Sequence, residues 1–424
     1  MFNRTLAYAG LRRPYRFERA IPAVLALFLL VAVLVAAAWL AAVDELTAGG
    51  PRAVYFLYLL ALLVLAMALV RWPRLAAALL VLALVEFAWG VGSHVLQRSG
   101  QAVASLLPPL AAEPERFRWH ALLQAAPIPG LGFTSPTGLR VSHTSEGTRG
   151  RDPVQGSLER RTVVATFGGS TTYDIGAGEG DTWSDRLGEA LGPERVYVVN
   201  HGVPGYSTVE HLVQTAFYQT KFGKPPRCAI YYVGWNDLRN AHIPKLDPGY
   251  ADFHLPSQVD SLKVRRIGGS HVTVSPLLTM LARIVSADVD TVRYSADPYG
   301  GQPSSDGDPV LEALYERNIR AISAINRERG IATVWVGQLV NRAQLTGDGL
   351  YGWLPLVRDR DVWPLLQRLN AILARTARAL GDVYVDPPID SFGAADFVDN
   401  GHFSARGARR FAEHLAPAAR EACR

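Results

Sequence analysis

The chain has 424 residues, which is enough for a membrane region and one or two soluble domains. Its formal net charge is +5, but almost all of this excess lies in residues 1–96, and residues 97–424 carry only about +1. Positive charge confined to the flanks of apolar segments is typical of a membrane protein, and it argues against a nucleic-acid partner.

Three long apolar segments occupy the N-terminal part of the chain. Residues 21–43 and 53–70 contain no charged side chain, and residues 75–96 contain only Glu86 and His94. Because about 20 apolar residues in a helix cross a bilayer core, we predict three transmembrane helices and interpret residues 1–96 as a membrane anchor. A buried hairpin of a soluble protein, or a cleaved signal peptide, fits three successive apolar segments poorly.

Arginines predict the orientation of this anchor. Five precede the first span, and Arg71 and Arg74 fill the turn between the second and third spans. The other turn has Asp44 and Glu45 against a single arginine. The positive-inside rule therefore predicts a cytoplasmic N-terminus, and three crossings place the rest of the chain on the periplasmic or extracellular side.

Glu86 is unusual because an acidic side chain within a membrane span is costly and is functional by default. Two interpretations place it in the membrane with a role, either in contact with a partner membrane protein or as a protonated acid. Two others give it no such role: the third span is shorter than residues 75–96, or Glu86 faces the two neighbouring spans.

Beyond the anchor, the pattern changes twice. Residues 97–160 are rich in proline and polar turn residues, and we interpret them as an extracytoplasmic connector. From residue 161, apolar runs alternate with amphipathic segments. The predicted strands are residues 162–167, 195–200, 228–233, 332–336 and 383–385, and the predicted helices are residues 182–191, 207–222, 309–329, 362–380 and 404–423.

Strands that alternate with helices predict parallel pairing and right-handed crossovers. We therefore expect residues 161–424 to form one α/β domain, a flavodoxin-like three-layer α/β/α arrangement around a parallel five-stranded sheet. Two connections, residues 238–308 and 339–360, are too long for simple turns. Both leave the carboxyl ends of strands, where such sheets bind ligands, so they either carry function or pack locally as surface insertions.

The first predicted strand ends in "FGGSTT", residues 167–172. The segment lacks the lysine of a P-loop and the glycine spacing of a dinucleotide loop. It also lacks the Gly-x-Ser-x-Gly pattern of the α/β-hydrolase elbow. Taken alone, this segment is as consistent with a turn as with a site.

Three other strand ends carry polar or glycine-rich sequences. They are "NHGVPG" at residues 200–205, "GWND" at residues 234–237 and "DNGH" at residues 399–402. Parallel strands bring such ends to one edge of the sheet. Together with Ser170 they supply a nucleophile, a base, a carboxylate that orients the base, and donors for an oxyanion, which are the groups that acyl transfer needs.

These segments, in this order, resemble the four blocks of the SGNH (GDSL-type) hydrolase superfamily, over residues 162–424. The resemblance implies that Ser170 is the nucleophile, His402 the general base and Asp399 its orienting partner. It also implies an oxyanion hole formed by the N–H groups of Ser170 and Gly205 and the Asn236 side chain. One departure is Gly169, where the family usually has aspartate.

The resulting hypothesis is a membrane-anchored extracytoplasmic serine esterase that acts on acyl esters, in particular an O-acetyl group on a cell-envelope glycan. An O-acyltransferase would use the same acyl-enzyme, and a non-catalytic envelope scaffold is the alternative from another class. No cofactor or metal is expected. Two cysteines, Cys228 and Cys423, are too few for a structural zinc site. Both are expected on the face opposite the active site, as a disulfide or as two separate thiols.

Overall fold

The computed structural model describes residues 14–40, 42–43, 46, 50–98, 106–108, 116–135, 138–246, 274–281, 301–351 and 354–424. Two compact units divide the chain. Met1–Glu113 and Gly269–Val292 form a helical unit, and Pro114–Gly268 and Arg293–Arg424 form an α/β unit. The first unit therefore takes up part of the long connection that was expected after the third strand of the sheet.

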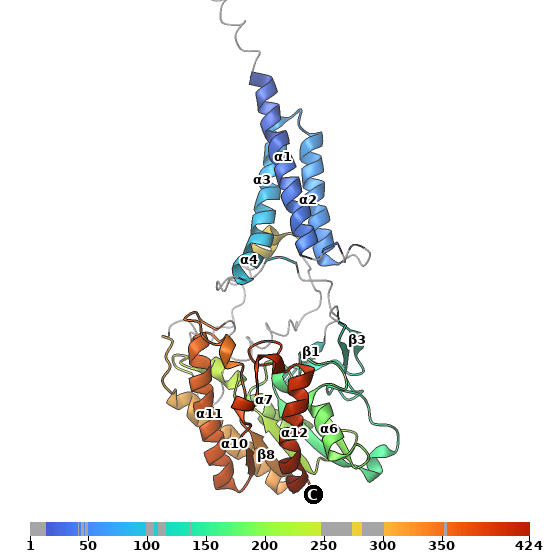
Figure 1. Ribbon diagram of the computed structural model, residues 1–424, viewed down its shortest axis with the longest axis vertical. Coiled ribbons are helices and arrows are strands. Elements are labelled where there is room, and N and C mark those ends of the chain that lie inside the picture. Colours follow the sequence, from blue (N-terminus) through green and yellow to red (C-terminus); the bar gives the residue numbers. More distant parts are fainter. Residues whose placement is uncertain are drawn as a thin grey trace, which may run out of the picture. The chain divides into compact units, whose positions relative to one another are not determined.

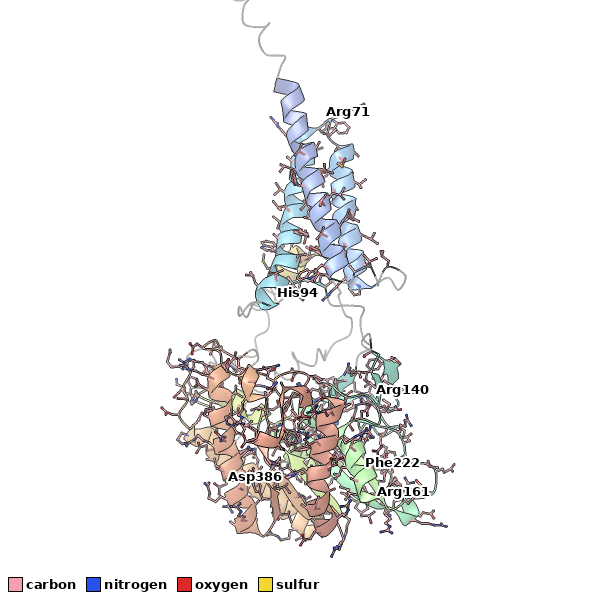
Figure 2. All side chains as sticks on the ribbon, viewed as in Figure 1. Arg71, His94, Arg140, Arg161, Phe222 and Asp386 are labelled. Atoms are coloured by element: carbon pink, nitrogen blue, oxygen red, sulfur yellow. A yellow bond between two sulfur atoms is a disulfide. The ribbon has the colours of Figure 1, made fainter. Side chains whose placement is uncertain are left out.

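Three helices, each antiparallel to the next along the chain, make up most of the described part of the helical unit (Figure 1). They are α1 (Pro14–Trp39), α2 (Pro51–Ala68) and α3 (Pro73–Phe87), and the last continues through a π-helical turn (Ala88–Gly92) into α4 (Ser93–Arg98). Proline opens both α2 and α3, where its missing N–H costs no hydrogen bond. Figure 2 places Arg71, in the turn between α2 and α3, and His94 at opposite ends of this bundle.

Two of these helical segments are long and apolar enough to cross a membrane. Pro51–Ala68 has a mean hydropathy of 1.9, and Pro73–Leu96 has a mean hydropathy of 2.1. The described apolar part of α1, Ala23–Trp39, is shorter than a full span. A third span at residues 21–43 therefore stays a prediction. Residues 1–13, together with Asp44 and Glu45, lie outside the described residues.

Glu86 lies inside the helical unit, where its side chain is 1% exposed. The hydroxyl of Tyr58 donates to its Oε1 at 3.2 Å, and Ser275 Oγ donates to the same oxygen. The main-chain N–H of Leu277 donates to Oε2 at 3.0 Å. Glu86 thus meets donors from a neighbouring helix and from residues 274–281 of its own chain. A membrane-protein partner at this residue stays a prediction that these contacts do not require.

The α/β unit contains a five-stranded sheet in which every neighbouring pair is parallel. Its strand order, β6-β5-β7-β8-β9, is the 2-1-3-4-5 order of a flavodoxin-like fold and confirms the predicted fold class. The strands are β5 (Thr162–Gly168), β6 (Val196–Asn200), β7 (Cys228–Tyr232), β8 (Ala332–Val336) and β9 (Val383–Val385).

Helices cover both faces of this sheet (Figure 1). Along β7, Ala229 and Tyr231 pack with one apolar cluster, and Ile230 and Tyr232 pack with the other, as the alternation of side chains along a strand requires. The first cluster includes α10 (Pro309–Glu328) and α11 (Asp359–Leu380), and the second includes α6 (Trp183–Leu191) and α12 (Ala405–Ala422). One predicted helix, residues 207–222, is shorter: it is α7 (Thr208–Val213), followed by a π-helical turn (Gln214–Tyr218).

The predicted connector contains structure that its turn-rich composition does not reveal. Two antiparallel hairpins occur there, β1 (Phe117–His120) with β2 (Gln124–Pro127), and β3 (Gly132–Thr134) with β4 (Arg140–Ser142). Phe117 and Val141 share an apolar cluster with Tyr173 and Tyr206 of the α/β unit. This part of the connector therefore packs on the domain that it precedes.

A disulfide joins Cys228, the first residue of β7, to Cys423, which follows α12. The two residues are 195 positions apart in the sequence. The bond lies where β7 begins, so it ties the last helix to the amino end of the central strand. Of the long connections, residues 247–273, 282–300 and 352–353 lie outside the described residues.

Candidate active site

Ser170 stands at the turn where β5 ends and the short helix α5 (Ser170–Tyr173) begins. Two glycines allow neighbouring atoms to come close at this turn. A Cβ atom on Gly168 would overlap the Thr172 hydroxyl, and a Cβ atom on Gly169 would overlap Nδ2 of Asn236. Because Ser170 opens α5, its N–H has no acceptor within that helix and can donate to a ligand.

His402 and Asp399 complete a hydrogen-bonded chain with Ser170. His402 Nε2 lies 2.7 Å from Ser170 Oγ, and His402 Nδ1 lies 2.7 Å from Asp399 Oδ2. The other carboxylate oxygen of Asp399 accepts the N–H groups of Gly401, at 2.9 Å, and of His402, at 2.8 Å. The carboxylate therefore favours the tautomer with a proton on Nδ1, which leaves Nε2 to accept the Ser170 proton.

Contacts with neighbouring loops hold this Asp399–His402 turn in place. The main-chain N–H of Val398 donates to the His402 carbonyl at 2.9 Å, and Asn341 N–H donates to the Asn400 carbonyl at 2.8 Å. A Cβ atom on Gly401 would overlap the ring of Trp235, so the indole lies directly against this turn. The base is thus positioned by residues from three separate loops.

Asn236 lies on the other side of Ser170. Its Nδ2 donates to the carbonyl of Tyr206 at 2.7 Å, which leaves the second hydrogen of that amide for another acceptor. Gly205, directly before Tyr206, has a positive φ of 83° that glycine adopts without strain. The predicted oxyanion donors Ser170, Gly205 and Asn236 therefore come from loops that meet beside the nucleophile.

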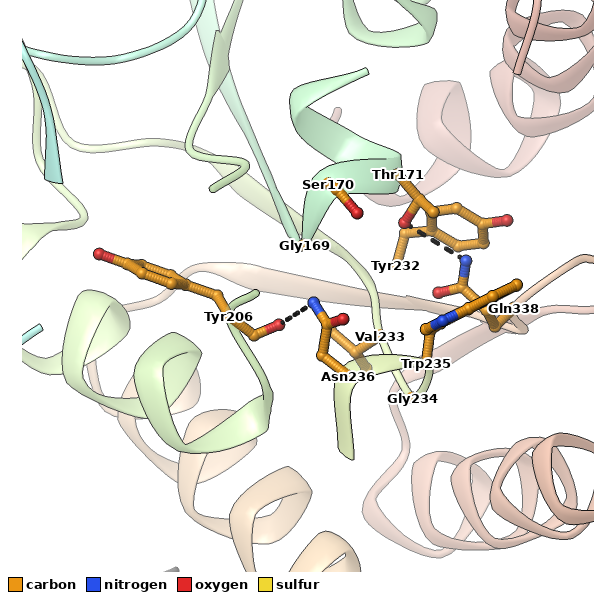
Figure 3. Close-up of a pocket in the computed structure, with 10 residues that line it drawn as sticks. All are labelled: Gly169, Ser170, Thr171, Tyr206, Tyr232, Val233, Gly234, Trp235, Asn236 and Gln338. Atoms are coloured by element: carbon orange, nitrogen blue, oxygen red, sulfur yellow. Dashed lines mark hydrogen bonds between the residues drawn. The ribbon is translucent and has the colours of Figure 1, made fainter. Parts of the chain in front are cut away.

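Figure 3 shows the pocket at this point, a hollow of about 210 Å³. Ser170 and Asn236 line it, and so do three residues that sequence analysis did not select: Tyr206, Trp235 and Gln338. Gln338 Nε2 donates to Thr171 Oγ1 at 3.3 Å. Trp235 lies within "GWND" and Tyr206 directly follows "NHGVPG", so both could have been found from those motifs, whereas Gln338 follows the fourth strand with no motif to mark it.

Asp237, the last residue of "GWND", has a structural contact. Its Oδ1 accepts hydrogen bonds from both the N–H and the hydroxyl of Thr208, at the start of α7. Asn318 of α10 donates to the same Thr208 hydroxyl at 3.0 Å. Asp237 therefore holds the segment that carries Gly205 and Tyr206 against the "GWND" loop.

The electrostatics keep Asp399 ionised. Partial burial raises its pKa, but the hydrogen bond from His402, the attraction between the two groups and two main-chain N–H donors together bring the pKa below its usual range. An ionised Asp399 can stabilise the imidazolium that forms when His402 takes a proton. Within the described residues, no group of three or more His, Cys, Asp or Glu side chains is arranged to hold a metal ion.

Comparison with known families gives a match across this whole site. Residues 166–410 match the model of the GDSL-like lipase/acylhydrolase family, which is more than half of the chain. The chain belongs to this family. It is therefore a GDSL-type hydrolase, and the matched range contains all of the residues that the sequence analysis selected for catalysis.

Solved structures of the same kind are similar at low sequence identity. A lipolytic protein of the G-D-S-L family from Desulfitobacterium hafniense is 11% identical, with 61% of this chain and 99% of that chain covered and a TM-score of 0.35. An acylhydrolase from Bacteroides fragilis is 14% identical, with 64% and 95% covered and a TM-score of 0.36. An acetylxylan esterase from Geobacillus stearothermophilus is 12% identical, with 60% and 93% covered and a TM-score of 0.35. No curated protein sequence matches this chain.

Proposed function

We propose that this GDSL-type hydrolase is a serine esterase in which Ser170 is the nucleophile, His402 the general base and Asp399 the group that orients it. The observation that carries the proposal is the continuous hydrogen-bonded chain from Asp399 Oδ2 through His402 to Ser170 Oγ, with both links at 2.7 Å. A serine hydroxyl is a weak nucleophile unless an adjacent base takes its proton, and this geometry supplies that base.

The chemistry proceeds through an acyl-enzyme. Ser170 Oγ attacks the ester carbonyl carbon while its proton moves to His402 Nε2, and the resulting oxyanion accepts hydrogen bonds from the Ser170 and Gly205 N–H groups and from Asn236 Nδ2. Collapse of this intermediate breaks the ester bond, and His402 returns the proton to the leaving alcohol. Water, activated by His402, then releases the acid from Ser170.

The size of the pocket supports a short acyl group. The large side chains of Trp235, Tyr206 and Gln338 line the hollow beside Ser170, and their bulk supports an acetyl group over a long acyl chain. We therefore propose an O-acetyl ester as the substrate, with a glycan of the cell envelope as the alcohol.

The second part of the proposal is that the protein is anchored in a membrane and that its α/β unit lies outside the cytoplasm. Two helical segments of sufficient length and hydropathy support an anchor. The Cys228–Cys423 disulfide supports an oxidising compartment, because such bonds are rare in the cytosol. The start of α1 and the turn that contains Arg71 lie at the same end of the bundle, which agrees with a cytoplasmic N-terminus (Figures 1 and 2).

The test uses the full chain in detergent, a fluorophosphonate probe and 4-nitrophenyl esters of increasing acyl length. We expect covalent labelling, turnover that is fastest with the acetate, and loss of both in Ser170→Ala. Ser305→Ala, at an exposed position in the α/β unit, is the matched control and should behave as wild type. Undiminished turnover by Ser170→Ala would refute the assignment.

A further inference from the structure

A second hollow, of about 690 Å³, lies in the α/β unit beside the hairpin β1–β2. Its walls come from that hairpin, from the loop around Gly147, from the end of β6 and from the residues that follow α7. The proposed chemistry at Ser170 uses none of its charged side chains. It is three times as large as the hollow beside Ser170, so it has room for a sugar ring.

Positive charge gathers on one side of this hollow. Arg118 and Lys221 line it together with His120, and the only acidic side chain in its lining is Glu146. Lys221 Nζ donates to the main-chain carbonyl of Glu146 at 3.0 Å, and the carboxylate of Glu146 accepts the N–H of Phe222 at 2.7 Å. The ammonium group of Lys221 therefore keeps donors for a ligand.

The pKa values of Lys221 and His120 reflect how close these groups lie to one another and to Arg118. Burial lowers the pKa of Lys221, and the nearby carboxylate of Glu146 offsets part of that decrease. Burial also lowers the pKa of His120, and the charges of Arg118 and Lys221 lower it further. Lys221 is a partly buried cation close to the exposed cation Arg118, so an anion bound between them would be stabilised.

A buried histidine at the wall of this hollow has an unused polar atom. His201 is 4% exposed, and its ring stacks on Phe167 with centroids 4.5 Å apart. Its Nε2 has no hydrogen-bond partner among the residues that the structure describes. Buried polar atoms without partners are rare in folded proteins, and each one calls for an explanation. That nitrogen is itself covered, so a ligand in the hollow would contact other atoms of this residue.

Aromatic rings supply a further wall. The ring of His120 packs edge to face against Tyr218, with centroids 5.2 Å apart. The Nδ1 atom of His120 accepts the N–H groups of Leu122 and Leu123, each at 3.2 Å, which places the ring proton on Nε2. Small-molecule sites combine such rings with a few well-placed polar groups, and a sugar presents both an apolar ring face and hydroxyls to them.

Tyr206 connects this hollow to the nucleophile. It lines both hollows: its hydroxyl donates to the carbonyl of Ala125 in β2, and its own carbonyl accepts Asn236 Nδ2. Figure 3 shows the Tyr206 ring pointing away from Asn236 and Ser170, toward the other side. A ligand that fills the second hollow would therefore contact Tyr206, which directly follows the proposed oxyanion donor Gly205 and accepts a hydrogen bond from the other donor, Asn236.

We propose that this second hollow binds an anionic saccharide unit of the acetylated substrate, with its charge at Arg118 and Lys221 and its ring against the wall that His120 and Tyr218 form together. The proposal rests on the proposed esterase function for the identity of the ligand as a substrate. It specifies the glycan as one that carries carboxylate or phosphate groups, and it makes Arg118 and Lys221 determinants of specificity.

Calorimetry on the full-length Ser170→Ala protein tests the site without reference to catalysis. The ligands are an oligogalacturonate, glucose 6-phosphate and an uncharged xylo-oligosaccharide. We expect an anionic ligand to bind and the uncharged one to bind at least tenfold more weakly, and the stronger of the two anions identifies the charged group. Substitution of Arg118 and Lys221 by glutamine should weaken binding of the anionic ligand at least tenfold, because the charge-assisted hydrogen bonds to the anion would be lost.

A second experiment measures kcat/KM for acetylated forms of the oligogalacturonate and the xylo-oligosaccharide. The ratio of their kcat/KM values should fall at least tenfold in the Arg118→Gln/Lys221→Gln protein and should not change in Arg160→Gln, an exposed arginine outside the hollow. This ratio does not depend on the folded fraction of a variant. Equal effects on both substrates, or equal binding of charged and uncharged ligands, would overturn the proposal while Ser170-dependent turnover of 4-nitrophenyl acetate upheld the esterase.

Discussion

The helical unit and the α/β unit differ in where they place large apolar side chains: the helical unit exposes many of them, and the α/β unit buries most of them. In the helical unit, Phe28 is 72% exposed and Val64 is 65% exposed, whereas Ala26 and Ala83 are buried between helices. In the α/β unit the order is reversed, and large side chains such as Trp335 are fully buried. Figure 2 shows the outward side chains along the helices of the first unit.

This difference indicates the surroundings in which each unit is stable. Water drives apolar surface inward, so the α/β unit has the arrangement of a soluble domain. Helices that turn many large apolar residues outward, and bury alanines as well as large side chains such as Leu59 between them, have an arrangement typical of helices in lipid. The two units also differ in what joins distant parts of the chain: the α/β unit contains the disulfide, and in the helical unit the buried carboxylate of Glu86 joins α2 and α3 to residues 274–281.

Loss of the disulfide should have the largest effect and should affect only the α/β unit. Crosslinking residues 195 positions apart restricts the unfolded chain, and for such long loops this contributes up to about 5 kcal/mol. Cys423→Ser should therefore lower the denaturant midpoint of the α/β unit, measured by hydrogen exchange on the full chain in detergent. Exchange in α2 and α3 should not change.

Reduction of the wild-type protein provides the control for this prediction. A reductant should lower the wild-type midpoint to that of Cys423→Ser and should have no effect on the variant. Cys228→Ser should match Cys423→Ser, since either substitution removes the same crosslink. A variant as stable as the oxidised wild type would show that the crosslink does not stabilise the unit.

Gly169→Ala should lower activity with little effect on stability, because the added methyl group would displace the Asn236 amide. Removal of one oxyanion donor costs about 10²–10³-fold in kcat, or about 2.7–4 kcal/mol. We expect Asn236→Ala to lose that amount, and Gly169→Ala to approach it, in kcat for 4-nitrophenyl acetate.

The double variant distinguishes displacement of Asn236 from a separate effect at Gly169. Once Asn236 is alanine, a methyl group at position 169 has no amide to displace, so Gly169→Ala/Asn236→Ala should be no slower than Asn236→Ala alone. Additive losses would show that Gly169 acts in some other way. The close approach of Asn236 also gives a physical reason why glycine stands here in place of the aspartate usual in the family.

Substitution of an exposed apolar residue by aspartate in each unit tests directly whether the two units face different surroundings. Phe28 in α1 and Val154 in the α/β unit are almost equally exposed, at 72% and 73%. If Phe28 faces lipid, a charge there costs about 2.5–3.5 kcal/mol. At Val154, which faces water, the change should stay within about 0.5 kcal/mol.

Thermal unfolding in lipid nanodiscs and the yield of inserted protein measure this difference. Phe28→Asp should lower both, and Val154→Asp should lower neither. Phe28→Leu, which keeps the side chain apolar, should behave as wild type. Equal tolerance of aspartate at both positions would remove the exposure argument for a membrane anchor.

The strands of the sheet and the residues at its carboxyl edge were predictable, since β8 and β9 have the predicted bounds. Alternating apolar runs mark such strands, and short motifs mark the loops that follow them. The hairpins β1–β4 were missed because strands of three or four residues leave no periodic pattern. Gln338 and the return of residues 274–281 to the helical unit depend on long-range packing, which no local pattern records.

Glu86 gives the smallest expected effect and the most direct test of what holds the helical unit together. Glu86→Leu would leave the hydroxyls of Tyr58 and Ser275 and the N–H of Leu277 without their acceptor, at about 1–3 kcal/mol. Glu86→Gln keeps one acceptor oxygen and should cost less. Ser275→Ala removes one donor to Glu86 and also the acceptor for the N–H of Leu278, and should cost about 1–2 kcal/mol.

A double-mutant cycle decides whether Glu86 and Ser275 act as a pair. Thermal unfolding of the full chain in nanodiscs should give a positive coupling energy between Glu86→Gln and Ser275→Ala, because both substitutions weaken the same hydrogen bond. The exchange of amides at residues 274–281 should rise in each single variant and should rise no further in the double variant. Strictly additive losses would mean that the Ser275 hydroxyl does not act through Glu86, which would leave Tyr58 and the N–H of Leu277 as the donors that stabilise the carboxylate.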